Sequence, residues 1–155
     1  FEGVITRFFT FRMYDSKYYY EKGMIHYNKS NFERAITNLT KAISLDKSNV
    51  SAYHTLGLCY YRKKTYDQAR LSFETVIKMT PNNQRAAYYL ALLYDYMKMP
   101  KEAVRMLEIA RGITVTNRNF TMLEIEKNKR LYLGTFQDYK LSADKILNLN
   151  EPILD

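Results

Sequence analysis

Few side chains in this sequence have the types and spacing that catalysis or metal binding needs. The two histidines, His26 and His54, lie far apart, and neither has a second metal-ligating residue three or four positions further along. The single cysteine, Cys59, excludes an internal disulfide and a cysteine-based zinc site. We therefore expect no metal site, and we expect Cys59 to be a buried, inert thiol on a helix.

The sequence also contains no motif that is typical of nucleophilic catalysis or of phosphate-binding loops. The five glycines are isolated from one another, so the chain has no phosphate-cradling loop and no dinucleotide-binding fingerprint. Carboxylates such as Glu124 and Glu126 are two positions apart, and this spacing directs side chains away from each other on a helix. We expect a protein that is not an enzyme and that needs no cofactor.

Length and composition indicate a folded protein with a diffuse positive charge. The 155 residues suffice for one domain or one stacked array, and 46% hydrophobic with 26% charged residues argues against wholesale disorder. The formal net charge of +8 is spread along the chain and is densest at residues 62–64. Such spreading favours solubility and attraction to acidic partners over a dedicated nucleic-acid surface.

The strongest pattern is a repeat whose period is 34 residues, the separation of Gly23 and Gly57. Three copies, at 16–49, 50–83 and 84–117, are each expected to form two helices joined by a short polar turn. Small and aromatic residues share one face of each first helix: Tyr19, Gly23 and His26; Tyr53, Gly57 and Tyr60; Ala87, Ala91 and Tyr94. A glycine inside a helix costs about 1 kcal/mol, so we expect a neighbouring helix to approach closely there.

This pattern resembles the tetratricopeptide repeat, whose signature combines W-x2-L-G-x2-Y, A-x3-F and a late proline over 34 residues. The resemblance covers Ser16–Asn117 and is best in the middle copy, where Tyr53 replaces the tryptophan. It implies an all-α, right-handed solenoid of three helix-turn-helix repeats with one or more C-terminal capping helices. The other two copies depart from the signature at Lys22, His26, Lys47, Ala87 and Val115.

The first helices also carry large side chains about 100° away from the packing face. In tetratricopeptide-like arrays these helices line the concave surface, so the resemblance implies a groove rich in tyrosine and methionine. The predicted lining is Tyr20, Met24, Tyr27, His54, Leu58, Tyr61, Arg62, Arg85, Tyr88, Leu92 and Tyr96. Such a lining favours an apolar or amphipathic segment of another protein.

Co-chaperone repeats that resemble this family bind the acidic carboxyl terminus of a chaperone through lysine, asparagine and arginine side chains. The matching positions here hold Tyr20, Met24, Thr55, Arg85 and Tyr89, of which only Arg85 is basic. We therefore predict a scaffold or adaptor that does not bind chaperone tails.

The two ends are predicted to be an aromatic segment at 1–15 and a polar-backed cap at 118–155, as the apolar end of a stack requires. In the cap we expect an amphipathic helix around 120–131, a turn at Gly134 and a short helix from Asp144 to Leu149. Because the chain begins at Phe1, we expect a trimmed or processed product, and the compartment, cytoplasmic or cell-envelope associated, stays open with any upstream signal or anchor. No run approaches the ~18 apolar residues of a membrane helix.

Three alternatives to partner binding stay open at this point. The first alternative is that residues 1–15 or 136–155 of the chain itself fill the groove. The second is that the array self-associates as a homo-oligomeric module of a larger, membrane-anchored protein. RNA binding is the least favoured, because only the net charge and the tyrosines support it.

Overall fold

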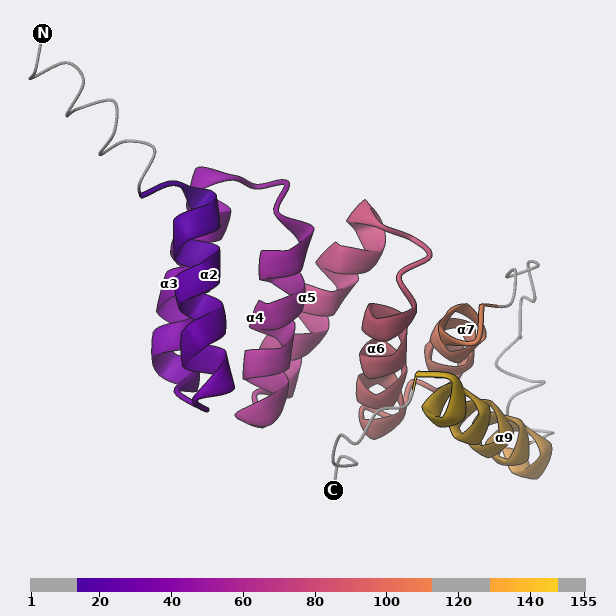
Figure 1. Cartoon of the computed structure of the whole chain (residues 1–155). Coiled ribbons are helices and arrows are strands. Elements are labelled where there is room, and N and C mark those ends of the chain that lie inside the picture. The colour runs from indigo at the N-terminus through magenta and orange to yellow at the C-terminus, as the bar shows by residue number, and fades with distance from the viewer. Residues whose placement is uncertain (1–13, 113–128, 148–155) are drawn as a thin grey trace, which may run out of the picture. The chain divides into compact units, whose positions relative to one another are not determined.

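A computed structural model of the chain describes residues 14–112 and 129–147. Within these residues every element is an α-helix and there is no strand, which confirms the predicted all-α class (Figure 1). The helices are α2 (Ser16–Asn28), α3 (Phe32–Leu45), α4 (Val50–Arg62), α5 (Tyr66–Met79), α6 (Gln84–Tyr96), α7 (Pro100–Ala110) and α9 (Lys129–Leu147). The predictions for residues 1–13, 113–128 and 148–155 lie outside the described residues.

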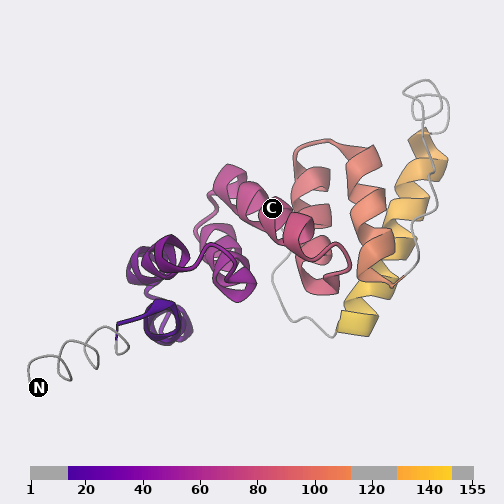
Figure 2. The ribbon, with the colours of Figure 1, turned by 90° about the horizontal axis from the view of Figure 1, so that it is seen from above.

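The helices form pairs that begin where the predicted repeats begin. The pairs α2/α3, α4/α5 and α6/α7 start at Ser16, Val50 and Gln84, and the two helices of each pair pack against each other. The chain divides into two compact units, Phe1–Met79 and Thr80–Asp155. In the first unit α3 packs against α4, which stacks the second pair on the first. In the second unit α9 lies beside α7 (Figure 2).

Each pair starts with the same helix cap. Asp15, Asn49 and Asn83 precede α2, α4 and α6, and each side-chain oxygen accepts a hydrogen bond of 2.9–3.0 Å from the backbone N–H three residues on. These bonds satisfy donors that the first turn of a helix leaves unpaired. The sequence period therefore fixes the start of every first helix.

The turn inside each pair is also repeated. Ser30, Lys64 and Lys98 adopt φ values of 59°, 62° and 58°, the left-handed region that favours glycine. In each turn the following residue donates its N–H to the carbonyl five positions back, at 2.8–2.9 Å. This is the Schellman arrangement that ends many helices, here built without glycine.

Replacing Lys64 by glycine should raise the free energy of unfolding by about 0.5–1 kcal/mol, because a Cβ in the left-handed region costs about 1–2 kcal/mol. The measurement is urea unfolding followed by circular dichroism. Lys64→Ala is the matched control, since it removes the same charge but keeps a Cβ, and we expect it to leave stability nearly unchanged. Equal stabilisation by both changes would contradict the backbone explanation.

The two glycines of the packing face lie where helices approach closely, as predicted. A Cβ built on Gly57 would lie 2.8 Å from Cζ of Phe73, and one on Gly23 would lie 2.8 Å from Cγ of Leu39. Phe73 and Leu39 are completely buried. Glycine therefore allows α4 and α2 to sit against the second helix of their own repeats.

Helix α9 corrects one prediction for the C-terminal part. It runs without a break from Lys129 to Leu147, so the turn predicted at Gly134 and the separate helix predicted from Asp144 are wrong. Phe136 and Ala143, seven positions apart on one face of α9, are buried. Burial of this face stabilises the helix, and it outweighs the cost of about 1 kcal/mol for a glycine inside it.

Candidate protein-binding surface

Five residues of the predicted lining form a partly exposed stripe on α2 and α4, in the first unit. These residues, which we call the tyrosine–methionine stripe, are Tyr20, Met24, Tyr27, His54 and Leu58, and all five are half-buried. The hydroxyl oxygen of Thr55 on α4 lies 3.3 Å from Sδ of Met24 on α2, so the two helices are in direct contact at the stripe. Tyr20 and Tyr27 also pack against the buried core of the unit.

Ring contacts hold two members of the stripe in place. The ring of Tyr27 lies 5.9 Å from that of Phe32, and the imidazole of His54 meets Phe73 edge-on at 5.4 Å. Both partners belong to the second helix of the same repeat. Because these rings are fixed before a ligand arrives, binding to them costs little side-chain entropy.

Three other residues of the predicted lining are buried. Tyr61 is 3% exposed and lies 6.4 Å, ring to ring, from Tyr66, while Tyr88 and Leu92 on α6 are 4% and 5% exposed. These three side chains present little area to a partner. The remaining predicted residues, Arg62, Arg85 and Tyr96, are exposed.

In the second unit α9 reaches the helix that carries Tyr88. The hydroxyl of Tyr88 donates a hydrogen bond to the Asp144 carboxylate of α9, and the guanidinium of Arg111 lies 4.9 Å from the ring centre of Tyr139. Contact between this part of α6 and the chain's own 136–155 region was one of the alternatives that the sequence left open. At Tyr88, therefore, a predicted lining residue of α6 contacts α9 of the same chain.

The structure places the cysteine and the candidate metal-ligating side chains among the residues that it describes. Cys59 is completely buried, as predicted, and this burial raises the pKa of its thiol to about 12. Among residues 14–112 and 129–147 no three His, Cys, Asp or Glu side chains gather closely enough to bind a metal ion. None of the described helices is long and apolar enough to cross a membrane.

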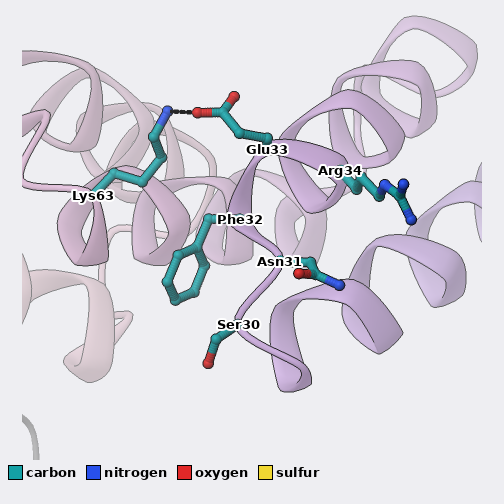
Figure 3. Close-up of a pocket in the computed structure, with 6 residues that line it drawn as sticks. All are labelled: Ser30, Asn31, Phe32, Glu33, Arg34 and Lys63. Atoms are coloured by element: carbon teal, nitrogen blue, oxygen red, sulfur yellow. Dashed lines mark hydrogen bonds and ion pairs between the residues drawn. The ribbon is translucent and has the colours of Figure 1, made fainter.

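Two open pockets in the first unit were not predicted from the sequence. One, of about 500 Å3, lies where α3 begins and contains the ion pair of Lys63 with Glu33 (Figure 3). The other, of about 450 Å3, is lined by side chains of α2 and α3, among them Lys22 and His26. Lys22 and His26 both depart from the repeat signature, and this departure was a sequence signal that could have indicated the second pocket.

Two family models match the chain: "TPR repeat" over residues 19–64 and "Tetratricopeptide repeat" over residues 50–83. The chain contains tetratricopeptide repeats. The matched residues include all of α4, which the 34-residue period identified as part of the best copy. No curated protein is significantly similar to the chain in sequence.

Solved structures of tetratricopeptide-repeat proteins are similar to the chain, which confirms the all-α solenoid class. A crystal structure of MamA is 28% identical with a TM-score of 0.60, over 76% of this chain and 62% of that chain. YrrB, "a TPR protein with an unusual peptide-binding site", is 23% identical with a TM-score of 0.66, over 88% and 73%. The Yersinia enterocolitica type III secretion chaperone SycD, in complex with a peptide of the translocator YopD, is 19% identical with a TM-score of 0.61, over 81% and 92%.

Proposed function

We propose that the chain is a non-enzymatic adaptor that binds an apolar or amphipathic segment of another protein along the tyrosine–methionine stripe. The observation that carries this proposal is the exposure of the stripe. All five residues remain partly accessible on two adjacent helices, and two of them, Tyr20 and Tyr27, also pack against the buried core. A helix that served only the core would carry polar residues at these positions.

The chemistry of the stripe favours a protein segment over a small molecule. Tyrosine supplies a large contact area at a low cost in conformational entropy, and the flexible thioether of Met24 adapts to side chains of varied shape. Two proteins of similar fold, YrrB and SycD, are described with a peptide-binding site and with a bound peptide. That analogy of fold supports the same class of ligand for this chain.

An acidic chaperone tail is not the ligand we propose. Thr55 and Tyr89, at two of the positions that would grip a terminal carboxylate, are buried, and Tyr20 and Met24 carry no charge. Of the predicted clamp positions only Arg85 is basic, and it is exposed. Arg62, which follows the stripe residues on α4, would instead orient a segment that carries acidic residues beside its apolar face.

The test is affinity capture from lysate of the source cell, comparing the wild-type chain with the double variant Met24→Ala/Leu58→Ala. We expect the proteins retained by the wild type to fall at least tenfold with the double variant, the order expected when anchor side chains of an interface are truncated. Quantitative mass spectrometry of the retained proteins measures the change, and far-UV circular dichroism checks that both proteins are folded.

A matched control separates the stripe from general surface hydrophobicity. Ile25→Ala/Leu71→Ala removes two aliphatic side chains of similar size that are 53% and 55% exposed and lie outside the stripe. We expect this variant to retain the same proteins as the wild type. Equal retention by both double variants would refute the assignment of the stripe.

A further inference from the structure

The open pocket of about 450 Å3 between α2 and α3 is lined only by basic and neutral polar side chains. Its residues are Lys22, His26, Arg34, Thr37 and Asn38, none of which belongs to the tyrosine–methionine stripe. Lys22 and Arg34 are exposed, and His26 and Asn38 are half-buried. The pocket therefore combines positive charge with access from solvent.

The acids of these two helices do not neutralise the pocket. The only acidic residue of α2 is Glu21, which lies 3.9 Å from Lys17, and the only one of α3 is Glu33, which pairs with Lys63. Figure 3 shows the guanidinium of Arg34 pointing away from the pair of Glu33 and Lys63. Among the described residues no carboxylate lies within ion-pairing distance of Arg34 or Lys22.

The pocket also offers more hydrogen-bond donors than the chain uses. The described contacts of Lys22 place its ammonium 5.9 Å from the centre of the Tyr18 ring, and the Asn38 amide donates one of its two N–H groups to the carbonyl of Arg34. Nδ1 of His26 is buried, and no described group forms a hydrogen bond with it. No such bond fixes the tautomer, so Nε2 can carry the proton and donate it to a ligand.

The equivalent face of the second repeat has a different role. Leu56 stands where the first repeat has Lys22, and it packs against the buried core that includes Ala35 and Leu39 of the first repeat. The first repeat therefore carries polar residues on the face that the second repeat uses for stacking. Solubility alone would be served by charges of both signs, whereas the charges of this pocket are all positive.

We infer that this pocket binds a phosphate group. A phosphate monoester carries −1.5 to −2 charges and three acceptor oxygens near neutral pH, which match the ammonium of Lys22, the guanidinium of Arg34 and the imidazole of His26. A carboxylate has two oxygens and half the charge, so it would leave part of this donor set unused. The phosphate is either a free ion or a phosphorylated side chain of another protein.

The test is an NMR titration of the full chain at constant ionic strength, with inorganic phosphate, a blocked phosphoserine and acetate as separate probes. Saturable shifts of the His26 imidazole and the Asn38 side-chain amide are expected with a phosphate probe, while His54 serves as an internal control and does not shift. Arg34→Gln and Lys22→Gln should each weaken binding about tenfold, as the loss of one charge-assisted hydrogen bond does. Lys41→Gln, the same kind of change at an exposed position of α3, is the matched control and should leave affinity unchanged.

The probes also distinguish the source of the phosphate. Tighter binding of blocked phosphoserine supports a phosphorylated protein, and binding of inorganic phosphate alone supports a site for the free ion. Shifts that do not saturate, equal loss of affinity in Lys41→Gln and Arg34→Gln, or acetate binding as tight as phosphate would each overturn the proposal. These outcomes are independent of the stripe, so they leave the proposed adaptor function untouched.

Discussion

Substituting alanine for Gly57 should lower the free energy of unfolding by about 1–3 kcal/mol, although alanine is the better helix former. The new Cβ would lie 2.8–3.0 Å from three atoms of the Phe73 ring, a separation that real Cβ contacts essentially never show. Phe73 is completely buried and His54 packs against its ring, so the ring has little room to move aside. Urea unfolding followed by circular dichroism measures the loss.

Two further variants test the reason for this loss. Gly134→Ala places the same methyl group where nothing lies within 4 Å, so we expect a gain of up to about 1 kcal/mol from helix propensity alone. The third repeat holds alanine and leucine, Ala91 and Leu107, at the positions equivalent to Gly57 and Phe73. Phe73→Leu should therefore restore part of the stability in the Gly57→Ala background. An additive loss in the double variant would contradict the steric explanation.

Native Cys59 should react with thiol reagents at pH 8 about a thousandfold more slowly than an ordinary cysteine, because its thiolate is scarce. Desolvation raises the pKa of this thiol to about 12 and outweighs the opposing effects of a backbone hydrogen bond and of Lys63. Labelling with iodoacetamide, with and without denaturant, measures the rate. Labelling of the folded chain as fast as that of the denatured chain would contradict the burial.

The same shift predicts a dependence of stability on pH. The folded chain holds the Cys59 proton more tightly than the unfolded chain does. The contribution of the protonated thiol to the free energy of unfolding is therefore fully present below the ordinary thiol pKa of about 8.5, and it is lost as the pH rises toward 12. Over that range the unfolding free energy of the wild type should fall more steeply than that of Cys59→Ala. Parallel curves for the two proteins would count against the shift.

The sequence predicted the repeats well because their signals are local. Gly57 and Phe73 belong to one helix pair, and a capping Asp or Asn recurs with the same 34-residue period as the start of each first helix. Such signals need no knowledge of distant contacts, so helix starts and the close approach at Gly57 could be predicted. The turn at Gly134 was predicted wrongly, because burial of Phe136 and Ala143 decides that helix.

The binding surface could be predicted only in part, for a physical reason. Helical spacing tells which face of α6 carries Tyr88 and Leu92, but it does not tell what other part of the chain contacts that face. The partner of the Tyr88 hydroxyl is Asp144, 56 positions further on in the sequence, and no local pattern relates the two. The basic pocket of the first repeat was missed because Lys22 and Arg34 belong to different helices.

The repeated left-handed turns have a practical consequence for protein engineering. Lys64 and Lys98 belong to different compact units and to neither proposed binding surface, so glycine at both should stabilise the chain nearly additively. A chain improved in this way would tolerate truncations such as Met24→Ala/Leu58→Ala without unfolding. If the Met24→Ala/Leu58→Ala variant of this stabilised chain no longer bound its partner, the loss of binding could be assigned to the tyrosine–methionine stripe and not to unfolding.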